Sequence, residues 1–211
     1  MAIQVQGNGG TIQEVDAAFR SARVTLRPME LIGYYSVSGS SGALTGVAAN
    51  GPVWSFRNTG ANLILVRRLS IGFVTTTAFT TAQGLQYEMF RANSFTASDT
   101  GGTALYTVGA NKHRNDFPNV TSAPDIRIAS TAALTAGTRT LQTAGMGIAG
   151  GSSTAVGTSM PITDILEQDS GDYPFVLALN EGFIIANGIA MGAAGVIRLQ
   201  VSVEYAEVSS Y

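Results

Sequence analysis

The last part of the chain, Gly195 to Val208 (GVIRLQVSVEYAEV), alternates strictly between apolar and polar residues. Its apolar positions are Ile197, Leu199, Val201, Val203 and Tyr205, and its polar positions are Arg198, Gln200, Ser202 and Glu204. Successive side chains of a β-strand point to opposite faces of the sheet, so a period of two predicts one buried face and one exposed face. The pattern therefore predicts a half-buried strand, whose polar face we expect either to meet solvent or to contact a neighbouring subunit.

Segments of similar character recur along the chain and are separated by turn-forming residues. Strands are expected at residues 26–37, 53–57, 63–74, 85–91, 104–108, 125–130, 138–143 and 174–187. The segments expected to be loops are Ser38–Gly42, Asn111–Pro124, the glycine-rich Gly145–Ser159 and the acidic Asp164–Asp172. About eight strands at short spacing, with little helical periodicity, predict an all-β antiparallel sandwich or barrel.

The first 24 residues differ from the rest and are expected to form an N-terminal arm. Ile12, Val15 and Phe19 fall at positions i, i+3 and i+7, the spacing of one or two helical turns. The expected organisation is an arm over residues 1–24 that carries a short helical turn, followed by a single β-sandwich domain over residues 25–211.

Charged residues make up 12% of the chain, about half of the usual share in soluble proteins. Glycine, alanine, threonine and serine replace them, and surfaces of short neutral side chains lose little side-chain entropy at a contact. Two interpretations remain open: a compact β-protein with threonine-rich sheet faces, or a subunit that lies against neighbours over much of its area. Lys112 is the only lysine beside many arginines, which reflects either codon bias or a preference for arginine at interfaces.

Motifs for catalysis or for cofactor binding are absent from the sequence. His113 is the only histidine, no G-x-S-x-G or P-loop motif occurs, and there are no cysteines. Asp164, Glu167, Asp169 and Asp172 lie close together, either as calcium ligands or as a solvated acidic loop, of which we favour the second. We expect no enzyme activity, no cofactor and no metal site.

Nucleic acid and membranes are not expected as partners. The net charge is −2, and Arg67 and Arg68 are neighbours on an expected strand, so their side chains point to opposite faces. The most apolar window, Phe183–Val196, is interrupted by Asn187 and by glycines and is too short to cross a bilayer.

Three stretches resemble virion structural proteins of tailed bacteriophages: Asn8–Pro28 (NGGTIQEVDAAFRSARVTLRP), Pro124–Leu141 (PDIRIASTAALTAGTRTL) and Pro174–Val208. The resemblance implies a jelly-roll-like β-sandwich that decorates or cements a capsid. It also implies a homotrimer at local three-fold positions, with the major capsid protein as partner and the virion surface as location. The stretches carry no ligand-binding motif.

The residues expected to contact a partner are the arm residues Ile12, Val15, Phe19 and Arg20, together with Trp54. For Trp54, packing in the core or at an interface is favoured over stacking on a sugar. A second hypothesis is a tail- or fibre-associated host-recognition domain that binds carbohydrate through the Asn111–Pro124 and Gly145–Ser159 loops. A third is an enzyme that degrades cell-wall or capsular polymer.

Overall fold

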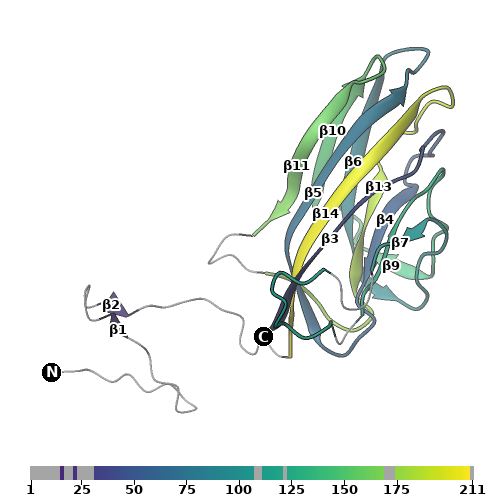
Figure 1. Cartoon of the computed structure of the whole chain (residues 1–211). Coiled ribbons are helices and arrows are strands. Elements are labelled where there is room, and N and C mark those ends of the chain that lie inside the picture. Colours follow the sequence, from purple (N-terminus) through teal and green to yellow (C-terminus); the bar gives the residue numbers. More distant parts are fainter. Residues whose placement is uncertain are drawn as a thin grey trace.

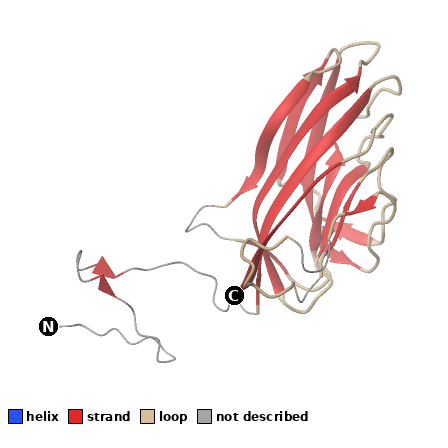
Figure 2. Cartoon of the chain, in the orientation of Figure 1, coloured by secondary structure: helices blue, strands red, loops and turns tan. Residues whose placement is uncertain are grey.

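The computed structural model describes residues 31–106, 111–120, 123–168 and 174–209, together with the backbone of residues 15–16 and 21–22. Two antiparallel sheets face each other across a single core, and strands account for all of the regular secondary structure in the described segments (Figures 1 and 2). The all-β sandwich predicted from the sequence is therefore confirmed.

The first sheet has the strand order β11-β5-β14-β3. Its strands are β3 (Leu31–Ser40), β5 (Leu63–Thr77), β11 (Ser159–Glu167) and β14 (Val196–Val208), and the short β12 (Phe175–Leu177) also pairs with β5. The closing segment is β14, which lies between β3 and β5 and pairs with both along most of its length. Its predicted alternation is observed, because Ile197, Leu199 and Val203 are wholly buried.

The second sheet has the strand order β10-β6-β13-β4-β8-β7. These strands are β4 (Pro52–Arg57), β6 (Gln83–Phe95), β7 (Thr103–Ala104), β8 (Asp125–Ile128), β10 (Gly147–Ser153) and β13 (Gly182–Asn187). A further short strand, β9 (Arg139–Leu141), pairs with the distal end of β6.

The connectivity is that of a jelly roll. If the main strands β3, β4, β5, β6, β10, β11, β13 and β14 are numbered one to eight, the first sheet has the order 6-3-8-1 and the second 5-4-7-2. Chain segments that are distant in sequence are thereby paired in both sheets, as in the double Greek key of jelly-roll proteins. The segment from β7 to β9 is inserted between the fourth and fifth main strands.

Large aromatic side chains fill the space between the sheets. Phe56 and Phe183 stack with ring centroids 5.2 Å apart, and Tyr205 meets Phe56 edge-on at 5.4 Å. Trp54 is wholly buried in the same core. Such aromatic pairs prefer offset or edge-on geometry, and each stabilises the core beyond the area that it buries.

The inserted segment covers part of the outer face of the second sheet. On β13, Phe183 and Ile185 point into the main core, so Ile184 points outward, yet it is buried with Phe95 in a second small cluster. Arg57 donates from the same outer side to Ser98 Oγ at 2.9 Å. The residues that follow β6 therefore fold back over this sheet.

The glycine-rich segment Gly145–Ser159, predicted as a loop, is a loop only in part. Seven of its residues form β10, which pairs regularly with β6. A Cβ at Gly147 would lie 2.4 Å from the carbonyl oxygen of Ile165, so this glycine allows β10 to approach β11 closely. The glycines of this strand reflect close packing of the backbone, a known role of glycine in strands, rather than flexibility.

Two further strand boundaries differ from the prediction. Ser38–Gly42 was expected to be a loop, but β3 continues through Ser38 to Ser40. The acidic segment after residue 163 begins as part of β11, which ends at Glu167. In both places polar residues lie on an exposed sheet face, where strand and loop have similar composition.

The described part of the arm is restricted to two short strands. β1 (Val15–Asp16) pairs with β2 (Ser21–Ala22) in an antiparallel register. The remainder of the predicted helical turn lies outside the described residues.

Candidate assembly surface

The middle of the outer face of the first sheet is built mainly from short, neutral side chains. On β3 the buried Tyr35 and Val37 alternate with Ser36, Ser38 and Ser40, which therefore point away from the core. Ser38 is paired in register with Ser202 on β14, which is paired in turn with Ser70 on β5. A row of serines thus crosses three adjacent strands, and the polar face predicted for the closing strand forms its centre.

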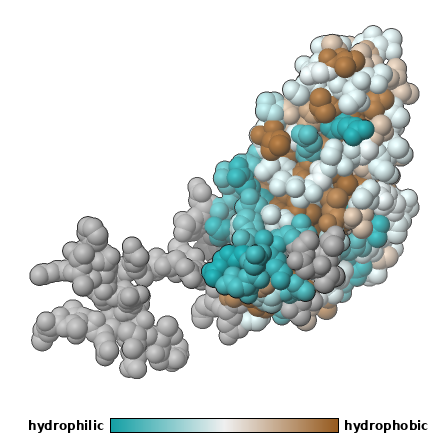
Figure 3. Space-filling model, in the orientation of Figure 1, coloured by the Kyte–Doolittle hydropathy of each residue, from teal (hydrophilic) through white to brown (hydrophobic). Residues whose placement is uncertain are grey.

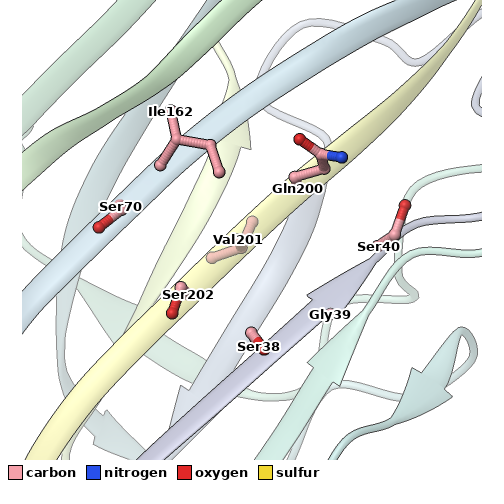
Figure 4. A pocket seen from close by; sticks show the side chains of 8 residues that line it. All are labelled: Ser38, Gly39, Ser40, Ser70, Ile162, Gln200, Val201 and Ser202. Carbon is pink, nitrogen blue, oxygen red and sulfur yellow. The ribbon is translucent and has the colours of Figure 1, made fainter.

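This serine row forms the floor of a shallow hollow of about 310 Å³, drawn in Figure 4. The lining residues are Ser38, Gly39, Ser40, Ser70, Ile162, Gln200, Val201 and Ser202. We refer to these residues as the assembly surface. Ile162 borders the hollow from β11 with 64% of its surface exposed, and Gln200 projects from β14.

Gly72 on β5 lies close to Ile162. A Cβ on Gly72 would lie 3.1 Å from Ile162 Cγ1 and from the carbonyl oxygen of Met160. The pairing of β11 with β5 is irregular between Met160 and Thr163, as in a β-bulge, and bulges redirect side chains at sheet edges. Gly72 and the irregular pairing of β11 together place the apolar side chain of Ile162 at the edge of the hollow, whose floor is lined by serine hydroxyl groups.

An ion pair lies at the β11 side of the surface. Arg68 donates to both carboxylate oxygens of Asp164, over 2.9 Å from Nε and 2.7 Å from Nη2, and Ser70 Oγ donates to the same carboxylate. The bonds from Arg68, followed by the bond from Ser70, hold the pKa of Asp164 below its usual range. Both charges are neutralised within the subunit, so a partner would not have to supply counter-charges for them.

A second carboxylate on this face is also paired. Tyr34 donates its hydroxyl to Glu204 Oε2 at 2.9 Å. Burial, followed by this bond to Glu204, raises the pKa of Tyr34 to about 12. Within the described residues, Arg198 makes no ion pair, and it lies on the same face of β14 as Gln200 and Ser202.

The space-filling view shows how these groups combine on one face. In Figure 3 the region over the first sheet is mostly pale, with scattered apolar patches, and strongly hydrophilic residues gather toward the lower end. Such a face combines small hydroxyl groups with isolated apolar contacts, and small neutral groups lose little side-chain entropy when they are covered.

Of the residues that the sequence singled out as partner contacts, only Trp54 has a side chain that the structure describes. Ile12, Phe19 and Arg20 lie outside the described residues, and Val15 is known only as a backbone position of β1. Trp54 is wholly buried and packs in the core, the first of the two placements favoured for it, where no partner of the folded subunit can reach it. The serine row was missed because SGSSG resembles a loop; the alternation of Tyr35 and Val37 with serines was the available signal.

The lone histidine lies in a loop next to β3. His113 is exposed and makes an edge contact with the ring of Tyr34, with centroids 4.5 Å apart. Its backbone amide donates to the carbonyl of Tyr34 at 3.0 Å, so this loop extends the edge of β3. Nearby, Arg114 and Asp116 pair with each other on the surface.

No group of three or more potential metal-ligating side chains occurs in the ranges that the structure covers. Of the acidic residues considered as calcium ligands, Asp164 is engaged by Arg68, whereas Asp169 and Asp172 lie outside those ranges. Among the described residues, no helix is long and apolar enough to span a membrane.

Comparisons of the chain with protein-family models, with curated protein sequences and with solved structures find no match.

Proposed function

We propose that this protein is a structural subunit of a bacteriophage virion, which decorates or cements the capsid by binding the major capsid protein, as a homotrimer. The observation that carries the proposal is the assembly surface, a sheet face of serines and glycine with one exposed isoleucine. The resemblance of three stretches of the chain to phage virion proteins, and the jelly-roll order, which also occurs in viral capsid domains, support the same role.

The physical argument concerns what must be desolvated when two subunits meet. Removing an unpaired charge from water is costly, whereas a hydroxyl can exchange a water for a backbone partner at little net cost. On this face Asp164 is already paired with Arg68, and Glu204 already accepts from Tyr34. Because capsid sites are numerous, modest affinity at each site becomes strong attachment when the sites are linked through an oligomer.

The carbohydrate-binding alternative has weaker support. It placed the contacts in two loops, but Gly147–Ser153 of the second one is a strand of the sandwich. Among the described residues, no aromatic side chain lines the hollow, whereas sugar platforms usually offer a ring for stacking.

The test is attachment of purified variants to capsids that lack this protein. We expect Ile162→Lys to weaken attachment by about tenfold or more, since a lysine head would have to be desolvated at the contact. Leu179→Lys is the control, because Leu179 is also an exposed apolar residue, at 51% against 64%, but lies in the turn between β12 and β13 and outside the assembly surface. Equal attachment of Ile162→Lys and wild type would overturn the proposal for this surface.

A second variant tests the arm. Removal of residues 1–24 should abolish attachment while leaving the thermal unfolding of the sandwich unchanged. Undiminished attachment of the shortened protein would exclude the partner-binding role of Ile12, Val15, Phe19 and Arg20.

A further inference from the structure

Within the described part of the chain, strand β10 at the edge of the second sheet contains no lysine, proline or register shift that would hinder pairing with another chain. Exposed edge strands are normally protected by lysine, proline or bulges that prevent a further strand from adding. Between Arg139 and Asp164 the sequence has no charged residue, and β10 itself consists of glycine, alanine, isoleucine and serine. Gly147–Ser153 pairs with β6 without a register shift.

The neighbouring edge of the first sheet differs in this respect. β11 contains Pro161, and its pairing with β5 is interrupted by register shifts at two places. The two edges lie next to each other at the same side of the sandwich (Figure 1). Because β11 has these protective features, their absence from β10 is a property of β10 alone and not of this whole side of the sandwich.

The backbone groups directed to the open edge can be identified from the pairing within the sheet. Gly188 donates to the carbonyl of Gln86, so the even-numbered residues of β6 near this point direct their backbone groups toward β13. The odd-numbered Tyr87 and Leu85 then face β10, where their partners are Ala149 and Gly151. The backbone groups of Ile148, Gly150 and Ser152 consequently point away from the sheet, and β10 lies at the end of the strand order.

We propose that β10 pairs with β10 of a second copy of this chain, in an antiparallel arrangement centred on Gly150, so that the second sheet continues from one subunit into the next. In this register Gly150 lies opposite Gly150 of the second copy and Ile148 lies opposite its Ser152. The outward backbone groups of all three residues then gain partners.

The composition of β10 suits pairing with itself in particular. A two-fold axis places the same patch on both sides of the interface, so every charge near the axis meets a like charge in its copy. The uncharged stretch around Gly150 avoids this repulsion. Ile148, with 62% of its surface exposed, and Met146, with 43%, lie beside the new strand pair and would be partly covered.

The contact does not depend on the proposed capsid role, since it uses the other sheet from the assembly surface. If the protein is also a trimer through another face, the β10 contact would join neighbouring trimers across two-fold axes.

Sedimentation equilibrium over a range of protein concentrations tests the proposal. We expect wild type to associate and Ile148→Lys to raise the dissociation constant of the two-fold contact about tenfold or more, because a charge is placed at the edge. Leu179→Lys, which is also exposed, at 51%, but lies in the turn between β12 and β13 outside both proposed surfaces, should associate like wild type. The comparison is the decrease in the average mass of the associated species relative to wild type. The test therefore also works if other contacts form a trimer.

A second pair of variants tests the strand pairing itself. Ser152→Pro removes an amide that points away from β6, so it should prevent association and leave the fold intact, whereas Ser152→Thr keeps the amide and should associate. Thermal unfolding of each variant confirms that the sandwich has formed. A wild type that shows no association, or an association that neither Ile148→Lys nor Ser152→Pro weakens, would overturn the proposal.

Discussion

The buried ion pair between Asp99 and Arg139 should be essential for keeping the inserted segment on the second sheet. The side chain of Asp99 is wholly buried and that of Arg139 is 7% exposed. Asp99 accepts from Arg139 and also from the backbone amide of Gly137 at 2.8 Å, and Arg139 lies over the ring of Phe95 at 6.0 Å. Replacing Asp99 by alanine would leave a guanidinium and an amide without this acceptor.

The size of the effect follows from these contacts. Breaking a buried ion pair by removing one partner costs about 3–5 kcal/mol, because the other charge stays behind uncompensated. The other oxygen of Asp99 already lacks a partner, and Arg139 can reach water by a small movement, so the lower end of this range applies. We expect Asp99→Ala to lower the free energy of unfolding by about 3 kcal/mol, a large part of the 5–15 kcal/mol that is typical of a domain.

Urea denaturation followed by tryptophan fluorescence measures this loss, because Trp54 is the only tryptophan and is wholly buried in the native core. The matched control is the double variant Asp99→Ala/Arg139→Met, which removes both charges and retains an apolar side chain over Phe95. It should recover a substantial part of the loss. A loss below about 1 kcal/mol in Asp99→Ala, or a double variant no more stable than the single one, would refute the reasoning.

Three further predictions concern packing and pH. Gly147→Ala should lower the free energy of unfolding by about 1–3 kcal/mol, because the new Cβ would meet a backbone oxygen. The control is Gly84→Ala, which should change the free energy of unfolding by less than about 0.5 kcal/mol because the nearest neighbour of its Cβ would be 3.9 Å away. Equal melting temperatures of the two variants would contradict this. Because the pKa of Asp164 is lowered in the folded state, its ionised form stabilises the fold above the ordinary carboxyl range, and this stabilisation is lost as pH falls through the lowered pKa. The difference in stability between wild type and Asp164→Asn should therefore be present at pH 7 and disappear on acidification. A difference that does not change with pH would exclude this contribution of Asp164. Because the pKa of Tyr34 is raised to about 12, the contribution of its hydroxyl to the stability of the fold is complete below pH 10 and declines as pH rises toward 12. Tyr34→Phe should therefore make the stability depend less on pH over that interval. A pH dependence equal to that of wild type would argue against this contribution.

The sandwich was predictable because strands such as β14 have one exposed face and one buried face. In β14, Ile197 to Tyr205 show this alternation in the sequence, and the predicted segment matches the observed strand closely. The jelly-roll order, in contrast, depends on which strands are neighbours in space, and strand periodicity carries no information on that. It came from the resemblance to phage virion proteins and is observed in the pairing of β14 with β3 and β5.

The assembly surface was only half predictable. The polar face of β14 was identified, but its serine neighbours on β3 were assigned to a loop, because Ser and Gly favour turns as strongly as they tolerate exposed strands. The same ambiguity hid β10, whose glycines mark close approach to β11. The burial of Trp54 was one of two open possibilities, and only the packing of both sheets decides between them.

The position of β14 between β3 and β5 has a consequence for biosynthesis. Ser38 and Ser70 become neighbours of Ser202 only after the strand that carries Ser202 has been made, so the serine row cannot exist on a nascent chain that still lacks residues 196–208. Pairing of segments so far apart in the sequence is slow, and it follows synthesis rather than accompanying it. A ribosome-bound fragment would therefore have no binding face, and recognition by a partner would be reserved for molecules in which this strand has been inserted.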